Sequence, residues 1–553
     1  MNDLSKDDVR RAAADVLGVE PGSIPDEANL IGHGMDSIRM MKLAGGWRRA
    51  GASVTFRELA EQPTVAHWHA LLTATAATPG PPAAAPAAPL PAVDGSAAFD
   101  LTPVQRAYWI GRREGMTLGG VGCHAYLELD GAGVAPDRLE TAVRQVLARH
   151  GMLRARFLDD GRQVVLDESP WTGLTVHDLG RSGAEDAERA LAGLRSRLSH
   201  RLLDVSRGEV FDVQLSLLPG GRTRIHVNID LLVADVASIE IVLADLATAY
   251  RDPGKLPAAP AYGFAQYLRD HRAWCGSATA PGSPLATARA YWRERIAGLP
   301  VSGPRLPLAV PPERITRPVF SRRSFRVGAP AWDRITAAAR RHGLTPAMVL
   351  ATAYAEVLGA WSEERRFLLN VPLFDRQPLD PAVNDMVADF TNLVLLAVDL
   401  RRPAPFAERV RDLQRQIQEN VSHAQYSTLN VLQDLRRANG GRRVGAPVVF
   451  ACNLGSAFVR PEVRGELGEW TWMLSQTPQV WLDHQVYKVD DEVLLAWDAV
   501  DELFPAGLME DMLRAYEDLL GRLAADDDAW SLPAGVTAGT AAGTSGRTGE
   551  EAP

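Results

Sequence analysis

The stretch RIHVNIDLLVADVASIEIVLADLATAYRD, residues 224–252, passes from one backbone periodicity to another. Its first part, RIHVNIDLL, alternates polar and apolar side chains, which predicts a strand. Its last part, VASIEIVLADLATAYRD, repeats apolar residues at a spacing of three and four, which predicts an amphipathic helix. Asp230, Asp235 and Ser238 stand around the turn between them. A strand that leads directly into a long helix indicates an α/β domain.

Both periodicities recur between residues 98 and 532. LETAVRQVLARH, residues 139–150, predicts another helix. Further strands are predicted at HAYLELDG (124–131), RFLLNVPLF (366–374), TNLVLLAVDL (391–400), PVVFACNLG (447–455) and EVLLAWDAV (492–500). We expect two halves, residues 98–275 and 276–532, with the crossing between them near residues 275–300.

A segment rich in Pro and Ala, residues 76–97, separates this domain from the first 75 residues. Its composition predicts a semi-extended tether without packed helix or strand. Residues 533–553 have a similarly low complexity, and we expect them to be a disordered tail or a linker.

The first 75 residues predict a small all-α bundle. Three helices are expected, over residues 5–19, 37–51 and 64–74, and Ser5 is the expected cap of the first. In the third helix the apolar residues Val65, Trp68 and Leu72 share one face. A bundle of this size leaves no room for a catalytic pocket.

Composition excludes several classes of function. The net charge is −9 and no Lys/Arg cluster is interleaved with aromatic residues, so we expect no nucleic-acid groove. The amino terminus lacks the apolar core of a signal peptide, and no run approaches ~18 uninterrupted apolar residues. We therefore expect a cytoplasmic protein without a membrane segment. The three cysteines are far apart and no His lies at ligand spacing, so neither disulfide nor metal site is expected.

One serine of the small bundle invites a choice between two readings. In LIGHGMDSIRM, residues 30–40, Ser37 can cap a helix, but a cap does not explain the two glycines before it. The segment resembles the thiolation (carrier) domain of nonribosomal peptide synthetases. That resemblance implies that Ser37 carries 4′-phosphopantetheine, added by a phosphopantetheinyl transferase. The positive end of a helix dipole suits an attached phosphate.

The larger domain resembles the heterocyclization subclass of condensation domains. Five segments carry the resemblance in the family's order: FDLTPVQRAYWIGR (99–112), RHGMLRARF (149–157), LLNVPLFDR (368–376), ADFTNLVLL (388–396) and SQTPQVWLDHQVY (475–487). The resemblance implies two chloramphenicol-acetyltransferase-like lobes in a V, with a tunnel at their junction.

The subclass is decided by NIDLLVADVASI, residues 228–239. Ordinary condensation domains have HHxxxDG here, and Asp230 and Leu231 stand in place of the two histidines. Leucine cannot move a proton, which excludes the ordinary mechanism. Asp235 and Ser238 complete the DxxxxDxxS of the heterocyclization type. We expect the two aspartates to pair with arginines and fix a loop, with Arg154 and Arg156 as candidate partners.

Cyclodehydration needs a proton donor for the departing oxygen and an acceptor for the nitrogen proton. Asp483 follows Val480, Trp481 and Leu482, where desolvation can raise its pKa enough to let it do both. Asn370 can hydrogen-bond the carbonyl or the hemiaminal hydroxyl.

The family resemblance points to the same two residues, with Gln485 and Thr477 as supporting candidates. The alternatives are a structural salt bridge for Asp483 and a turn or strand-end cap for Asn370.

One position departs from the family. Some members have threonine in a PVVFTS segment, whereas PVVFACNLG places Ala451 there. Either Asp483 and Asn370 suffice together with a water, or this domain condenses better than it cyclizes.

The order of the domains implies a donor. A carrier with no activating domain ahead of it resembles the amino-terminal part of pyochelin/yersiniabactin-type siderophore synthetases. This implies an aryl cargo, preferably salicyl, from a stand-alone aryl-adenylating enzyme. It also implies a Cys (or Ser/Thr) acceptor on a carrier served by downstream adenylation and carrier domains, and a thiazoline (or oxazoline) product. The alternatives are a condensation-only domain and a non-catalytic scaffold that recruits carriers.

Overall fold

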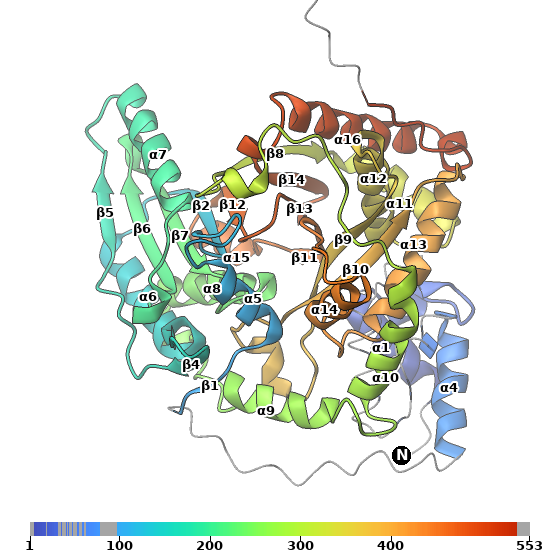
Figure 1. Cartoon of the computed structure of the whole chain (residues 1–553). Helices are drawn as coiled ribbons and strands as arrows, with labels where there is room; N and C mark the ends of the chain where they lie inside the picture. The colour runs from blue at the N-terminus through green and yellow to red at the C-terminus, as the bar shows by residue number, and fades with distance from the viewer. Residues whose placement is uncertain are drawn as a thin grey trace, which may run out of the picture.

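The computed structural model describes residues 5–17, 19–30, 35, 40, 43, 47, 52, 54, 58–59, 62–77 and 97–538. The predicted attachment residue Ser37 lies outside the described residues. Figure 1 shows two α/β lobes side by side, one built mainly from the first half of the large domain and one from the second. The predicted order, a small helical region followed by a two-lobed α/β fold, is confirmed.

The amino-terminal region is helical where it is described. Its helices α1 (Lys6–Leu17) and α4 (Val65–Ala77) pack together. Ser5 caps α1: the Asp8 amide donates to Ser5 Oγ at 3.2 Å, and the Ser5 amide donates to Asp8 Oδ2 at 2.9 Å. This is the reciprocal pattern of a capping box.

Apolar side chains fill the centre of this bundle. The predicted face Val65, Trp68 and Leu72 is buried. The rings of Trp68 and Trp47 meet edge to face at 5.6 Å. Of the helix expected over residues 37–51, the described residues Met40, Leu43 and Trp47 are helical and buried, and the rest lies outside the described part. Helix α4 also includes Ala76 and Ala77, two residues that we expected to belong to the tether.

The first lobe is built on a five-stranded sheet of order β12-β2-β7-β6-β5. Helices α6 and α8 cover one face and α7 lies against the other, as Figure 1 shows. The elements are β2 (His124–Ala132), α6 (Pro136–Arg149), β5 (Thr175–Asp178), α7 (Ala184–Ser199), β6 (Phe211–Leu217), β7 (Arg222–Asp230), α8 (Val236–Arg251) and β12 (Glu469–Gln476). The strand and helix predicted from residues 224–252 are β7 and α8.

A small sheet of order β1-β4-β3 accompanies this lobe. Helix α5 follows β1 and begins at a capping box in which Thr102 and Gln105 bond each other's backbone amides. The bounds are β1 (Phe99–Asp100), α5 (Pro103–Gly111), β3 (Ala155–Phe157) and β4 (Arg162–Val165).

The second lobe has a six-stranded mixed sheet of order β10-β9-β11-β13-β14-β8. Its strands are β8 (Phe320–Val327), β9 (Arg366–Phe374), β10 (Thr391–Asp399), β11 (Val448–Ala457), β13 (Leu482–Val489) and β14 (Glu492–Val500). The large core of the lobe lies between this sheet and α11 (Ala329–Arg341), α12 (Pro346–Trp361), α13 (Phe406–Val421) and α16 (Leu508–Ala525). Helices α10 (Pro284–Arg295) and α14 (Thr428–Ala438) pack on the other face of this sheet at its β10 edge. Helices α9 (Phe264–Cys275) and α15 (Pro461–Glu466) pack on the core of the first lobe.

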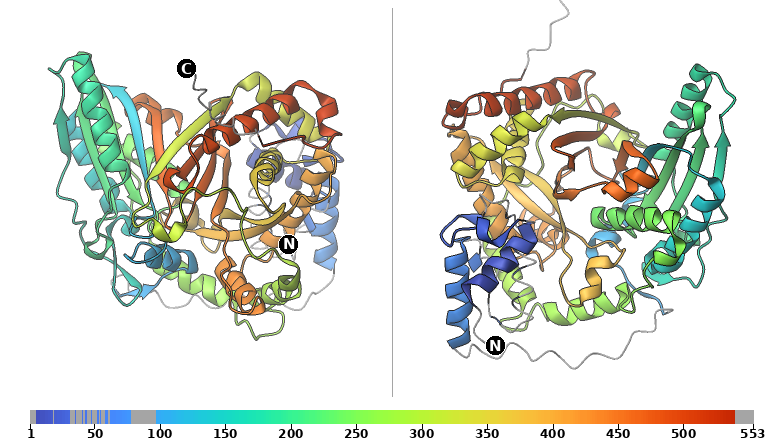
Figure 2. Two further views of the ribbon diagram at one scale, coloured as in Figure 1. Left: turned by 45° about the horizontal axis from the view of Figure 1, so that its top comes forward. Right: turned by 180° about the vertical axis from the view of Figure 1, so that it is seen from behind.

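Some segments that follow residue 276 belong to the first lobe, which the expected division at that residue does not capture. Strand β12 comes late in the chain but pairs with β2 in the sheet of the first lobe, and Figure 2 shows it there. Val383, Met386 and Phe390 likewise belong to the core of the first lobe. Alternating hydrophobicity predicts that such segments are strands or buried, but not which sheet they join.

Ala534 is buried, its carbonyl accepts from Arg522 Nη2 at 2.8 Å, and Val536 packs on the core, so ordered contacts extend past residue 532.

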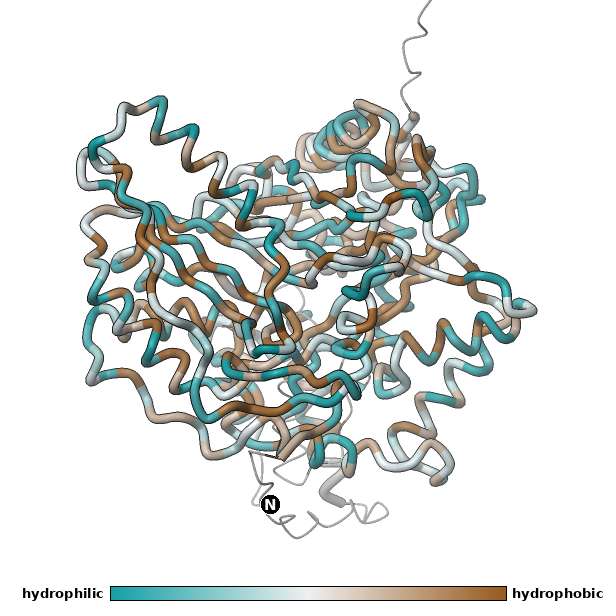
Figure 3. Tube along the Cα trace, turned by 60° about the vertical axis from the view of Figure 1, so that its left-hand side comes forward, coloured by the Kyte–Doolittle hydropathy of each residue, from teal (hydrophilic) through white to brown (hydrophobic). Residues whose placement is uncertain are grey.

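Apolar and polar residues alternate along the strands of the first lobe (Figure 3). Among the described helices, none is alone long and apolar enough to cross a membrane, although α11 and α12, bent by 101°, pass that test as a pair.

Candidate active site at the lobe junction

Asn370, Val449 and Asp483 form one row across three neighbouring parallel strands. Val449 of β11 is the register partner of Asn370 in β9 and of Asp483 in β13. Neighbouring strands lie about 4.8 Å apart, so the backbones of Asn370 and Asp483 are about 10 Å apart, and partners in register share a face. The row therefore brings together the two residues that the sequence analysis selected.

The row faces away from α11, α12, α13 and α16, while on its own face Leu368 and Leu395 pack with α10 and α14 near the β10 edge. The residues that alternate with it, Leu369, Phe450 and Leu482, belong to the core beneath the first four of these helices. Tyr487, four residues after Asp483 on the same face of β13, belongs instead to the core of the first lobe. The row consequently lies on the sheet face directed toward the first lobe.

Asp483 is a buried carboxyl with one bare oxygen. Its side chain belongs to a residue only 5% exposed, Oδ2 accepts from Gln485 Nε2 at 2.9 Å, and Oδ1 has no hydrogen-bond partner. No described Lys or Arg forms an ion pair with it, so the salt-bridge alternative is not observed. Burial, assisted by the nearby charge of Asp498, raises the pKa of Asp483 to about 7, against the hydrogen bond from Gln485 and the charge of Arg322. A carboxyl with this pKa can both take and give a proton near neutrality.

The amide of Gln485 has only one workable orientation. Its Oε1 accepts from Arg322 Nη2 at 3.0 Å and from the Tyr487 hydroxyl at 2.7 Å, so its NH₂ must face Asp483. Arg322 is itself held by two bonds to Asp498, at 2.7 and 2.5 Å. Because this arrangement fixes Oδ2, the bare Oδ1 of Asp483 stays directed away from it. Gln485 and Tyr487 share the face of Asp483 in sequence, but no signal predicts that Arg322 of β8 joins them.

Asn370 lies in the middle of β9, which is inconsistent with a strand-end cap. Its Oδ1 is buried and has no hydrogen-bond partner among the described residues. A buried acceptor without a hydrogen bond lowers the stability of the fold by roughly 1–3 kcal/mol, and such a group in a native structure is commonly one that binds a ligand.

Ala451 lies one step along the same face. It is the register partner of Gln485, two residues from Val449. A threonine at this position would stand next to Gln485, so the chain lacks a hydroxyl beside the row.

Thr477 lies against the first lobe rather than against Asp483. Its Oγ1 is 3.6 Å from Cys123 Sγ. Pro478 of the same loop lies so close to α5 that a Cβ added at Gly111 would be only 2.8 Å from the Cβ of Pro478. The predicted supporting role of Thr477 therefore corresponds, in the structure, to a contact that seats the loop before β13.

Asp235 and Ser238 join the lobes through Arg376. Asp235 is the N-cap of α8, where its Oδ1 accepts from the Ser238 amide at 2.7 Å and from Arg376 Nη2 at 2.6 Å. Ser238 Oγ donates to the Ala388 carbonyl at 2.7 Å and accepts from the Ala388 amide at 3.1 Å. We call Asp235, Ser238 and Arg376 the latch.

Asp230 has its own arginine. It is fully buried and pairs with Arg112 Nη1 at 2.9 Å, at the end of α5. The expectation that arginines hold both aspartates is met, but the suggested partners are wrong. Arg154 donates instead to the carbonyls of Leu147, Ala148 and Leu166, and Arg156 is exposed. Both real partners come from segments distant in the chain, and no local pattern in the sequence points to them.

Asp389 is a buried residue to which the sequence analysis assigned no role. It is completely buried, Oδ1 accepts from the Thr391 amide at 3.0 Å, and Oδ2 has no hydrogen-bond partner. Burial raises the pKa of Asp389 to about 8. The position of this aspartate between apolar residues, in ADFTNLVLL, was the sequence feature that indicated a buried carboxyl.

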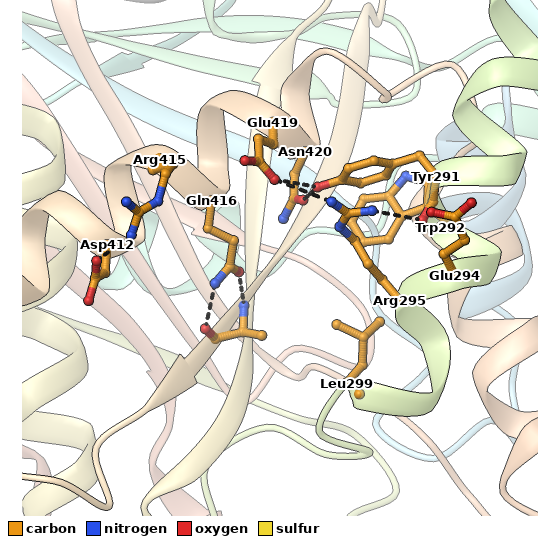
Figure 4. A pocket seen from close by; sticks show the side chains of 12 residues that line it. Tyr291, Trp292, Glu294, Arg295, Leu299, Asp412, Arg415, Gln416, Glu419 and Asn420 are labelled. Atoms are coloured by element: carbon orange, nitrogen blue, oxygen red, sulfur yellow. Dashed lines mark hydrogen bonds and ion pairs between the residues drawn. The ribbon is translucent and has the colours of Figure 1, made fainter.

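A surface cavity of about 500 Å³ lies apart from this row, between α10 and α13 (Figure 4). There the Gln416 amide bonds both backbone groups of Ala397, at 2.6 and 2.9 Å, and closes the edge of the sheet at β10. The cavity contains neither Asn370 nor Asp483.

The comparisons with known proteins define the class. The condensation domain family matches residues 98–455, and the phosphopantetheine attachment site family matches residues 7–72. The chain belongs to the condensation domain family and carries a phosphopantetheine attachment domain ahead of it. The prosthetic group of such a domain is 4′-phosphopantetheine.

Two known proteins match nearly the whole length of this chain. The chain is 44% identical over 526 residues to pyochelin synthetase PchE of Pseudomonas aeruginosa, covering 94% of this chain and 36% of that protein. It is 42% identical over 532 residues to phenyloxazoline synthase MbtB of Mycobacterium tuberculosis, covering 95% and 36%. The chain thus spans about a third of the length of these relatives.

A solved structure agrees with the subclass. The cyclization-docking bidomain of EpoB from Sorangium cellulosum superposes with a TM-score of 0.72 at 33% identity, over 83% of this chain and 89% of that one. The starter condensation domain of rhizomide synthetase RzmA, at 19% identity and a TM-score of 0.62, shares the fold.

Proposed function

We propose that the chain is a carrier–heterocyclization unit of a siderophore-type nonribosomal peptide synthetase. In this proposal Ser37 is the attachment residue, and the donor is an aryl thioester, preferably salicyl. The lobe junction condenses it with a carrier-bound Cys, or Ser/Thr, and cyclodehydrates the amide to a thiazoline or oxazoline. The observation that carries the proposal is the row of Asn370 and Asp483, each with a bare buried oxygen.

The chemistry proceeds in three balanced steps. The acceptor amine attacks the donor carbonyl, and the donor thiol leaves with a proton. The acceptor thiol or hydroxyl then adds to the new amide carbonyl, and its proton goes to the carbonyl oxygen. Finally the C–O bond breaks, nitrogen loses its proton, a C=N bond forms and water leaves.

The row suits the second and third steps. Asn370 hydrogen-bonds the carbonyl oxygen as it becomes a hydroxyl. Asp483 moves protons in the dehydration, for which a pKa of about 7 is well matched. Leu231 has no titratable group, which agrees with a mechanism that does not use the usual histidine. Tethering of both substrates supplies a high effective concentration.

The names of the relatives support the proposed aryl donor and ring product. A phenyloxazoline synthase makes an aryl-substituted ring, which favours an aryl donor and leaves oxazoline as well as thiazoline in range. We further propose a phosphopantetheinyl transferase, a stand-alone aryl-adenylating enzyme and downstream adenylation and carrier domains as partners, in the cytoplasm.

The test is a single-turnover assay. The chain is loaded with salicyl-pantetheine, mixed with a cysteinyl carrier, and the acceptor product is weighed by intact-protein mass spectrometry. We expect the amide mass less one water, and no product from S37A. An amide without loss of water would contradict cyclization and favour condensation alone. Absence of any transfer would favour a scaffold that recruits carriers.

A further inference from the structure

Leu118 and Gln479 share an uncommon backbone conformation, and the proposed function gives neither of them a role. Among the described residues other than glycine, φ is positive at three: Leu118 (52°), Gln479 (69°) and Asp490 (53°). A residue with a Cβ is strained in this conformation, and such strain persists only where the surrounding structure holds it. Leu118 and Gln479 hold each other, because the Gln479 amide donates to the Leu118 carbonyl at 3.0 Å.

Leu118 belongs to the segment that joins α5 to β2, residues 112–123, which we call the strap. Both of these flanking elements accompany the first lobe. Leu118 is nevertheless only 1% exposed and lies in the core of the second lobe. The strap therefore crosses the junction and buries one apolar side chain on the far side.

The end of β7 holds both ends of the strap. Arg112 pairs with Asp230 at 2.9 Å and donates from Nη2 to the Leu203 carbonyl at 2.7 Å. At the other end, the Leu231 amide donates to the Cys123 carbonyl at 2.8 Å. The first aspartate of the DxxxxDxxS motif thus anchors the strap.

The strap lies against residues 477–479, the loop before β13. Besides the hydrogen bond between Leu118 and Gln479, Thr477 Oγ1 lies 3.6 Å from Cys123 Sγ. The Gln479 side chain is exposed, so this residue contacts the strap through its backbone. The strap thus holds the loop both at its start and at its end.

The same loop determines where Asp483 lies. Asp483 follows Gln479 by four residues, and between them the Trp481 amide donates to the Pro447 carbonyl at 2.8 Å. Pro447 directly precedes β11, two residues before Val449, the register partner of Asp483. The start of β13 is consequently tied to β11 and, through the loop, to the strap.

We propose that Leu118 and Gln479 are positioning residues, which keep Asp483 buried and in the row with Asn370 during ring formation. The proposal rests on the proposed function. Neither residue contacts the substrate in it, since the strap acts through the loop that precedes Asp483. A misplacement of about 1 Å at Asp483 should slow ring formation about 100-fold. Amide formation does not use Asp483 and should change little.

The first test replaces Gln479 in the full chain. Q479P removes the amide hydrogen that binds Leu118 and fixes φ near −65°, whereas Q479G keeps the amide and adopts positive φ without strain. Both variants lose the same exposed side chain, so they differ in the backbone alone. In the single-turnover assay, Q479P should form the amide within about twofold of wild type and the ring about 10- to 100-fold more slowly. Q479G should match wild type in both.

The second test removes the apolar anchor of the strap. L118A is compared with L519A, because Leu519 of α16 is equally buried in the same core. Both variants lose the same packing groups, so a merely structural role predicts the same behaviour for the two. At a temperature at which both remain folded by circular dichroism, L118A should form the ring about tenfold or more slowly than L519A.

The pH profile of ring formation is a readout that a merely structural role would not move. Burial raises the pKa of Asp483 to about 7, so a looser loop that admits water should lower this pKa toward its ordinary value of 3.8. The acid limb of the profile should move to lower pH in Q479P and L118A. It should stay in place in Q479G and L519A.

The other titratable groups that face Asp483 are of two kinds. Asp498 of β14 and Arg322 of β8 form an ion pair at 2.5 Å, which is common to all four variants. The remaining groups have pKa values that burial raises well above their ordinary values near 9 and 10, so they do not titrate on the acid limb. They are Tyr108, Cys123, Tyr354 and Tyr487.

Three results would overturn the proposal: wild-type ring formation by Q479P, equal losses in Q479P and Q479G, or equal losses in L118A and L519A. If Q479P does not fold, the comparison of L118A with L519A decides alone. If wild type makes no ring at all, the proposed function fails instead. If D483N stops ring formation while Q479P and L118A keep the wild-type rate and pH profile, only the strap is wrongly assigned.

Discussion

Asp483 should weaken the fold that it serves. Its folded-state pKa of about 7 exceeds its ordinary value of 3.8, so the folded protein retains a proton that the unfolded chain loses. The resulting loss of stability begins as pH rises through about 4 and is complete above about 7. Such a cost is typical of residues kept for catalysis.

D483N should therefore stabilise the protein above neutrality. At pH 8 the free energy of unfolding should rise by roughly 1–4 kcal/mol, and near pH 4 by almost nothing. Urea denaturation at the two pH values measures this. A gain that does not depend on pH, or a loss at pH 8, would show that Asp483 is not a buried carboxyl with a raised pKa.

Gln485 should set the pH at which Asp483 works. Q485L removes the hydrogen bond that lowers the pKa of Asp483, so the acid limb of the ring-formation profile should move to higher pH. The profile is measured from preformed amide, with Q418L on α13 as a control that leaves it unchanged. An unmoved limb in Q485L would separate Gln485 from the proton-transfer step.

At the level of elements, the latch joins the start of α8 to the chain before β10. Its carboxylate and hydroxyl come from the first lobe and its arginine from the second, and all three are largely buried. The same segment that the latch holds at Ala388 also carries Asp389. The DxxxxDxxS motif thus acts on the geometry of the junction without touching the row.

R376M should destabilise the protein strongly. Removing one partner of a buried ion pair leaves an uncompensated charge, at a cost of about 3–5 kcal/mol. Thermal or urea unfolding measures this against R156A, which alters an exposed arginine and should change stability by about 0.5 kcal/mol or less. If R376M and R156A unfold alike, the latch does not hold the lobes.

For the whole molecule, local sequence patterns predicted which segments form strands and helices better than they predicted which segments pack against one another. The strand containing Asn370 and the helix headed by Asp235 follow from periodicity, whereas the strand containing Asp483 was not among the predicted elements. The placement of β12 in the other lobe, and the pairing of Asp230 with Arg112, depend on contacts between distant segments. Arg322 escaped notice for the same reason, since only the folded chain places it beside Gln485.

The row of Asn370 and Asp483 is expected to cyclize an amide that the same junction has formed. The most direct measurement is the product partition of D483N against wild type, by intact-protein mass spectrometry after one turnover. We expect wild type to yield the dehydrated ring product and D483N to accumulate the amide. Equal water loss in the two proteins would contradict it.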